Sequence, residues 1–167
     1  MMKRNYWFLF ILLLFSQPLL AERLARCQEI LDYIHEYLPD HGTLLENANG
    51  FLYVKVDDDY IHKLNEFVKE EGFEEPPYFG QLYTDGAHVS VIYPEELADR
   101  KRPKIAEVGK KVYFQTKGCG VWETPGSPLG SKEVCFVLVD APFLGQLREK
   151  YGFSAEDNFH ITIGIRR

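Results

Sequence analysis

A chain of 167 residues has room for one domain with a sizeable hydrophobic core, and it is too short for two ordinary domains. The composition, with 46% hydrophobic and 26% charged residues, is that of a globular protein and excludes a disordered chain. The chain is acidic, with a formal net charge of −6, which excludes tight binding of long nucleic acid through release of counterions.

The first 21 residues have the organisation of a secretory signal peptide. The basic pair Lys3-Arg4 is followed by an apolar run over residues 6–15 and by a small residue, Ala21, at the expected cleavage position. The run is shorter than the roughly 20 apolar residues of a membrane-spanning helix, so an uncleaved signal anchor is the second interpretation. We therefore expect residues 1–21 to be a signal peptide cleaved near Ala21, and residues 22–167 to be one exported domain, periplasmic or secreted.

Loss of this leader makes the domain more acidic. It removes two of the 19 basic residues and leaves 17 against 25 acidic residues, a net charge near −8. A nucleic-acid substrate of such a domain is expected to be short or a single chain end. Contact with a membrane is expected only through the leader, if the leader stays uncleaved.

The first half of the domain is predicted to alternate between helices and strands. Apolar residues at helical spacing predict an amphipathic helix over residues 24–38, and an apolar run predicts a strand over residues 51–56. Three aspartates then precede a predicted helix over residues 60–71. We expect them to cap that helix rather than bind Ca²⁺, because they lack the spacing of a calcium loop. A strand follows over residues 87–93, and a short helical turn over residues 94–99.

The second half repeats this order in a coarse way. The predicted strands cover residues 111–116, 120–123, 134–139 and 158–165, and the predicted helix covers residues 143–151. The order strand, helix, strand therefore occurs over residues 51–93 and again over residues 134–165. In each half, the closing strand carries a histidine near its start.

Three cysteines, Cys27, Cys119 and Cys135, leave room for one disulfide in an oxidising compartment. We expect Cys119 and Cys135 to pair, because they flank a turn-rich segment. Three buried free thiols are the alternative. The spacing of the cysteines does not resemble a zinc site.

Two predicted strands carry the side chains that are candidates for catalysis. Successive side chains on a strand point to opposite faces, so one face of the 87–93 strand receives His88 and Ser90. One face of the 158–165 strand likewise receives His160 and Thr162, and the other face of each strand is apolar. Partly exposed polar residues on the open face of a sheet are the structural alternative to a functional site. The remaining histidines, His35, His41 and His62, are expected to lie in surface or capping positions.

Two imidazoles and two hydroxyls can carry out phosphodiester cleavage near neutral pH. Imidazole, with a pKa near 6.5, can take a proton from a nucleophile or give one to a leaving oxygen. Hydroxyl groups can donate to the phosphoryl oxygens as charge develops on them. This scheme requires no metal or cofactor, and the two strands offer too few ligands for a catalytic metal site.

The segments His88-Val-Ser90-Val and His160-Ile-Thr162-Ile resemble the paired His-x-Ser/Thr-apolar motifs of the 2H phosphoesterase superfamily. Its members include RNA 2′,3′-cyclic phosphodiesterases, once called 2′–5′ RNA ligases. The resemblance covers about residues 50–167. It implies a bilobal α+β fold with pseudo-two-fold symmetry, in which two antiparallel sheets face a central cleft and the helices lie outside. It also implies that His88, Ser90, His160 and Thr162 are the catalytic residues.

The resulting prediction is a monomeric, metal-independent phosphodiesterase that hydrolyses a small 2′,3′-cyclic phosphate or an oligonucleotide end. The alternative is an exported binding or host-interaction protein that keeps the same scaffold without catalysis. Weaker candidates for substrate contacts are the basic stretch over residues 100–111, which could attract anions, and four aromatic residues that could stack on a base. These aromatic residues are Tyr83, Tyr93, Tyr113 and Trp122.

Overall fold

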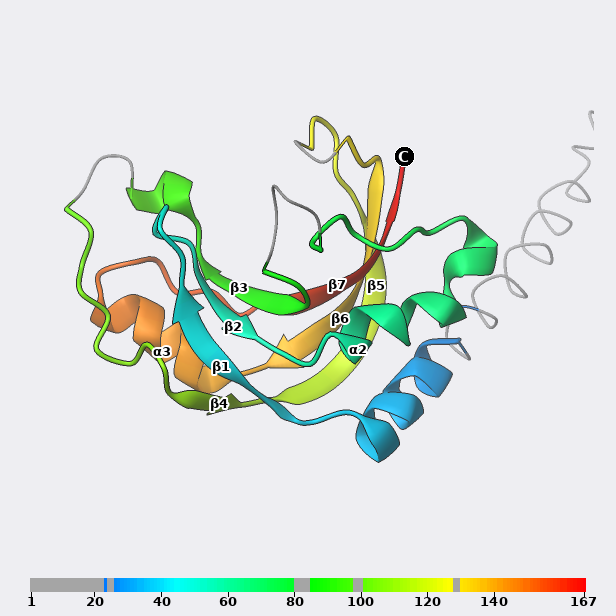
Figure 1. The fold of residues 1–167 in the computed structure, drawn as a ribbon, viewed down its shortest axis with the longest axis horizontal. Coiled ribbons are helices and arrows are strands. Elements are labelled where there is room, and N and C mark those ends of the chain that lie inside the picture. Colours follow the sequence, from blue (N-terminus) through cyan, green and yellow to red (C-terminus); the bar gives the residue numbers. More distant parts are fainter. Residues whose placement is uncertain (1–22, 24–25, 80–84, 98–100, 128–129) are drawn as a thin grey trace, which may run out of the picture.

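The computed structural model describes residues 23, 26–79, 85–97, 101–127 and 130–167, so the expected leader and Tyr83 lie outside the described residues. One curled, fully antiparallel sheet of seven strands forms the centre of the molecule (Figure 1), in the order β4-β1-β2-β3-β7-β6-β5. The strands are β1 (His41–Glu46), β2 (Leu52–Lys55), β3 (His88–Ile92), β4 (Lys111–Tyr113), β5 (Gln115–Glu123), β6 (Glu133–Asp140) and β7 (His160–Arg166).

The helical elements are short. They are a helix over residues 26–37, α2 (Asp59–His62), α3 (Pro142–Lys150) and the 3₁₀ turns η1 (Asn65–Phe67), η2 (Lys69–Glu71) and η3 (Pro94–Leu97). Within the described part of the chain, no helix is long and apolar enough to cross a bilayer.

The α+β class is as predicted, but the described strands form one continuous sheet and not two. Four strands, β4-β1-β2-β3, lie on one side of the junction, and three strands, β7-β6-β5, lie on the other. The junction is the pairing of β3 with β7, the two strands that carry the motif histidines, and its register partners are Val89 and Ile161. Curling of a single twisted sheet therefore brings the two halves together where two separate sheets were expected.

A row of apolar side chains crosses the sheet on its covered face. Leu44 pairs with Val54, Val54 with Val89, and Val89 with Ile161, which in turn pairs with Val137. All five side chains are 0% exposed. Burial of a Val, Leu or Ile side chain is worth roughly 1.5–3 kcal/mol, so this row alone fixes which face of the sheet is buried. The opposite face is left for the polar motif residues.

Three segments differ from the sequence-based expectation. The strands predicted over residues 111–116 and 120–123 are divided at Phe114 instead, into β4 and a continuous β5. Strand β1 was not predicted, although it forms a hairpin with β2 through the turn at Asn47, whose side chain accepts the N–H groups of Asn49 and Phe51. The predicted helix over residues 60–71 is broken into α2, η1 and η2. The buried amide of Asn65 donates to the carbonyl of Ile163 at 3.1 Å, which ties this segment to β7.

The aspartates before α2 have divided roles. The carboxylate of Asp57 accepts the N–H of Asp59 at 2.9 Å, as expected for a group that caps a helix start. The carboxylate of Asp58 makes no bond to the helix and accepts the N–H of Ala87 instead, at 2.9 Å.

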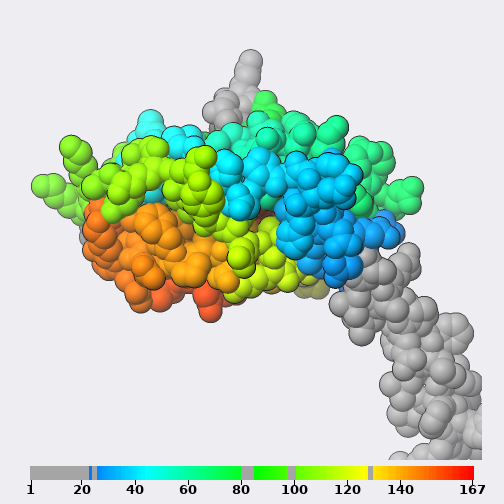
Figure 2. Space-filling model, turned by 90° about the horizontal axis from the view of Figure 1, so that it is seen from below, coloured from blue at the N-terminus to red at the C-terminus, as the bar shows by residue number. Residues whose placement is uncertain are grey.

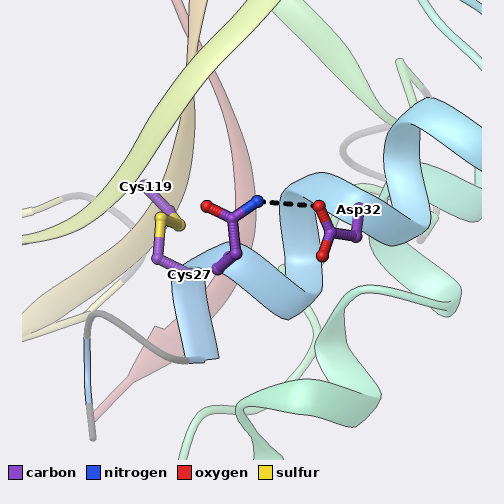
Figure 3. Close-up of a disulfide and its surroundings, with 4 residues drawn as sticks. Cys27, Asp32 and Cys119 are labelled. Atoms are coloured by element: carbon purple, nitrogen blue, oxygen red, sulfur yellow. Dashed lines mark hydrogen bonds between the residues drawn. A yellow bond between two sulfur atoms is a disulfide. The ribbon is translucent and has the colours of Figure 1, made fainter. Parts of the chain in front are cut away.

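The disulfide joins Cys27 to Cys119, so the predicted pairing of Cys119 with Cys135 is wrong. It attaches the helix over residues 26–37 to β5, as Figure 3 shows, and this helix (blue in Figure 2) lies against the β5 edge. Cys119 and Cys135 are on neighbouring strands, but Cys119 lies opposite Val137, two residues further along β6. Cys135 is a buried free thiol, and burial raises its pKa to about 12.

This pairing predicts which cysteine governs sensitivity to reductant. Reduction of a bond that spans 92 residues is expected to lower the free energy of unfolding by roughly 2–4 kcal/mol, measured by chemical denaturation. Cys27→Ser should be equally destabilised and insensitive to reductant, whereas Cys135→Ser should respond like the unmodified protein. Loss of the reductant effect in Cys135→Ser would contradict the assigned disulfide.

Candidate active site

The four motif side chains lie together on one face of the β3–β7 junction. Because Val89 is the antiparallel partner of Ile161, His88 lies opposite Thr162 and Ser90 lies opposite His160. Directly opposite side chains have Cβ atoms about 4.5–5.5 Å apart, and diagonal neighbours are about 7–8 Å apart. All four are partly buried, while Val89 and Ile161 between them point into the core. The strands thus form a square of two imidazoles and two hydroxyls.

Neighbouring strands extend this square into two rows. Lys55 of β2 lies opposite His88, and Phe136 of β6 lies opposite Thr162. In the second row, Tyr53 lies opposite Ser90, and Leu138 lies opposite His160. Since paired residues share a face of the sheet, these four side chains border the polar square.

Both imidazole rings are anchored by a hydrogen bond to the backbone carbonyl two residues earlier. The Nδ1 of His88 lies 2.7 Å from the carbonyl oxygen of Gly86, and the Nδ1 of His160 lies 3.1 Å from that of Asn158. A carbonyl oxygen can only accept, so Nδ1 carries the proton in each ring. The Nε2 atom of each histidine is then the nitrogen that can exchange a proton with a ligand.

Burial lowers the pKa of His88 from the ordinary value of 6.5, because it disfavours the charged imidazolium. The carbonyl of Gly86 and the charge of Asp85 act in the opposite direction, while the positive charges of Lys55 and His160 add to the lowering. His88 therefore favours the neutral form when no ligand is bound.

Burial also lowers the pKa of His160. Here the carbonyl of Asn158 and the carboxylate of Glu156 both oppose the change by favouring the protonated ring. The two histidines thus share the same backbone anchor but have different charged neighbours.

Aromatic rings enclose both histidines. The ring centroids of Tyr78, Phe51 and Tyr53 lie 4.8, 5.4 and 5.7 Å from that of His88. On the other side, Trp122 and Phe136 lie 4.7 and 5.6 Å from His160 and 3.8 Å from each other. These rings partly bury the imidazoles and present flat apolar surfaces beside the polar square.

Two of the aromatic residues singled out in the sequence lie at this site. The Tyr93 hydroxyl is hydrogen-bonded to Ser90, and Trp122 contacts His160. Both retain about 40% exposure, 42% for Tyr93 and 38% for Trp122. Tyr113 lies instead on the edge strand β4, beside His41.

The other histidines occupy surface positions, as expected. His41 contacts Asp40 at 3.3 Å, and His62 contacts Glu75 at 3.0 Å. In the basic stretch, Arg102 bonds Glu46 and the carbonyls of the β1–β2 turn, which gives it a structural role. Across the described ranges, no three His, Cys, Asp or Glu side chains are grouped in a way that could hold a metal ion.

Sequence analysis missed several residues at the edge of the site. Lys55, Asp58 and Gly86 meet at the turn before His88, but they are brought there by strand pairing and by a turn, which no periodic pattern marks. The signals available were the Gly86 position two residues before His88 and the alternation of Tyr53 and Lys55 on β2.

Comparison with known proteins identifies a family. A family model described as "Swiss Army Knife, 2H phosphoesterase domain" matches residues 52–167, which include both motif strands. Among curated proteins, the protein translocase subunit SecA of Desulforudis audaxviator (strain MP104C) is 28% identical over 102 residues. That match covers 58% of this chain and 11% of SecA, so the chain spans a small part of that relative. No solved structure matches the chain significantly.

The turn before β3 gives a direct test of how His88 is held. Gly86 has a φ of +62°, and a Cβ there would collide with Asp58 and Lys55. Gly126 has a φ of +75°, and a Cβ there would meet nothing within 4 Å. Gly86→Ala and Gly126→Ala should each lower the free energy of unfolding by about 1–2 kcal/mol through backbone strain. Only Gly86→Ala should alter the ¹⁵N signals of the His88 imidazole in NMR spectra. An unchanged His88 in Gly86→Ala would contradict the assigned carbonyl anchor.

Proposed function

The chain belongs to the 2H phosphoesterase superfamily, and we propose that it is a metal-independent phosphodiesterase that hydrolyses a 2′,3′-cyclic phosphate through His88 and His160. The observation that carries this proposal is the square of two imidazoles and two hydroxyls on paired strands. Family membership supports phosphodiesterase chemistry in general, and the geometry of the square supports the two-histidine mechanism.

The proposed reaction is in-line attack of water on the cyclic phosphorus. One imidazole takes a proton from the water through Nε2, and the new P–O bond forms as the bond to one ribose oxygen breaks. The other imidazole gives its Nε2 proton to that departing oxygen, so the proton count balances. The opposed positions of His88 and His160 across the junction support this division of labour, because the attacking and leaving oxygens lie on opposite sides of phosphorus.

The two hydroxyls complete the proposed phosphate site. Ser90 lies opposite His160 and Thr162 lies opposite His88, so each hydroxyl occupies the corner between the two imidazoles. From there they can donate hydrogen bonds to the non-bridging phosphoryl oxygens as negative charge develops.

The surroundings of the square support a nucleotide as the substrate. Trp122 and Tyr93 are partly exposed rings on the two sides of the polar square, and a nucleobase can stack on such rings. The acidic charge of the chain supports a mononucleotide or a short RNA end over long RNA. We also propose that the protein acts as a monomer outside the cytoplasm. The Cys27–Cys119 disulfide supports export, because such bonds persist in oxidising compartments.

The proposed function is tested by incubating the purified protein, in the presence of EDTA, with 2′,3′-cyclic nucleotides and short RNAs ending in a cyclic phosphate. Glycerol 1,2-cyclic phosphate, which has no base, is the matched substrate control. His88→Ala and His160→Ala are each expected to reduce kcat by roughly two to four orders of magnitude. His41→Ala, on a strand of the same sheet, should leave the rate unchanged.

Three outcomes contradict parts of the proposal. Full activity in His160→Ala rules out the two-histidine mechanism. Equal turnover of the base-free substrate rules out nucleobase recognition. Binding of nucleotides without turnover by a folded protein favours the alternative of a non-catalytic binding protein on the same scaffold.

The lowered pKa values of both histidines predict an acidic activity profile. The general base must be neutral and the general acid protonated, and kcat/KM reports these states in the free enzyme. Since burial lowers both pKa values below 6.5, the imidazole that must donate a proton is more than half neutral at pH 6.5 and loses its proton further as the pH rises. We expect kcat/KM to decline as the pH rises above 6.5, measured with a cyclic mononucleotide. A profile that still rises from pH 6.5 to 8 would contradict the assignment.

A further inference from the structure

Lys55 is the charged side chain closest to the motif residues in the strand register. It lies on β2 directly opposite His88, so the two side chains share the face that carries the polar square. The Lys55 side chain is 29% exposed, which places it between the core and the solvent. Neither catalysis by the two histidines nor the family motif accounts for a lysine at this position.

Asp58 links Lys55 to the segment that precedes His88. Its carboxylate forms an ion pair with the ammonium of Lys55 and accepts the N–H of Ala87 at 2.9 Å. These contacts join the end of β2 to the start of β3 across 29 residues of chain. Because the Ala87 bond fixes the carboxylate, the ammonium is held in place rather than left to rotate freely in solvent.

The turn at Gly86 packs directly on this ion pair. Gly86 has a positive φ, and its Cα approaches Lys55 and Asp58 so closely that a Cβ would collide with both. The carbonyl of the same residue accepts the Nδ1–H of His88 at 2.7 Å. The ion pair therefore supports the turn, and the turn supplies the group that orients the ring.

We propose that the Lys55–Asp58 ion pair is a positioning element of His88, which braces the turn over residues 85–87 and holds one positive charge beside the imidazole. The proposal rests on the proposed function in that it takes His88 as a reacting group. Lys55 acts through His88 and is not itself assigned a contact with the substrate.

The charged groups that act on the His88 pKa come from three neighbouring segments. Asp85 lies in the preceding turn and favours the imidazolium, whereas Lys55 on β2 and His160 on β7 disfavour it. The Tyr53 and Tyr78 rings also contact the imidazole, and the Tyr53 hydroxyl donates to Asp85. Lys55 is thus the lysine that pushes the His88 pKa downward, together with the larger effect of burial.

Within the described residues, no lysine or arginine is among the charges that act on His160. Its charged neighbour is the carboxylate of Glu156, which favours the protonated ring. Because both rings use a backbone carbonyl as anchor, charged neighbours such as the ion pair and Glu156 make the two sites unequal. An acid–base pair needs such an inequality, since one group must be neutral while the other is charged.

The test is an NMR titration of both histidines in variants of the full protein. In Lys55→Met, loss of the cation should raise the His88 pKa by about 0.3 pH unit, the effect of a unit charge roughly 10 Å away in a water-like dielectric, and by more at shorter range. In Asp58→Asn, which keeps an oxygen for the Ala87 N–H, the charge of Lys55 is no longer compensated, so the His88 pKa should fall. His160 serves as the internal reference and should move less in both variants.

Matched controls separate this effect from a general change in charge. Lys69 and Glu66 form an exposed ion pair of the same sequence spacing in the η1–η2 segment, away from the square. Lys69→Met and Glu66→Gln should leave both histidines unchanged. Lys55→Arg, which keeps the charge, should restore the His88 pKa toward that of the unmodified protein.

Opposite shifts in Lys55→Met and Asp58→Asn support the proposal. Shifts in the same direction would show that the pair acts only by keeping the turn folded, and absence of a shift would show that it does not act on His88. Either result overturns the proposal. The titration does not depend on turnover, so an inactive protein would refute the proposed function while the titration still decides the role of the pair. In an active protein, one limb of the kcat/KM profile should move with His88.

Discussion

The site depends on the pairing of β3 with β7 through Val89 and Ile161. Both side chains are 0% exposed, and burial of this pair fixes the register of the only junction between the two halves of the described sheet. Because side chains alternate along a strand, a slip of one residue would exchange the buried and open faces of the strand that slips and place its histidine, His88 or His160, in the core. Core packing and the placement of the polar square therefore depend on the same strand register. The hydrophobic free energy that stabilises this register also stabilises the geometry of the site.

The two rings are oriented by backbone and differentiated by side chains. A carbonyl two residues before each histidine fixes the ring without adding a formal charge, so the same anchor serves both halves. The charges that differ come from elsewhere in the chain, Lys55 from a neighbouring strand and Glu156 from the loop before β7. Because the anchors are alike and the charged neighbours differ, the geometry of the square can be symmetric while the pKa values of its two imidazoles differ.

The features that depend on alternation of side chains along one strand could be predicted from the sequence. The features that depend on which strands pair, and in which register, could not. The motif strands were found because each has one apolar and one polar face, and the structure brings their four polar residues together. The Cys119–Cys135 pairing and the two-sheet architecture were wrong, because both depend on which strand lies beside which. Strand β1 was missed because its alternation is short and Gly42, which approaches the backbone of Lys55, resembles the end of a helix. Lys55 was missed because only the register between β2 and β3, which the sequence does not show, places it beside His88.

Burial of the two imidazoles disfavours the protonated form that the proposed reaction needs, and an anionic substrate can favour that form again. Aromatic rings and burial favour the neutral forms of His88 and His160, whereas the proposed reaction requires one of them to carry a proton. A phosphate anion bound between the rings favours the imidazolium, because an opposite charge at close range raises the pKa of a histidine. The protonation that catalysis needs would then arise with binding, in a partly buried site where the attraction is less screened than in bulk water. An acidic protein can thus hold a small phosphodiester through local donors and cations, without the extended positive surface that long nucleic acid requires.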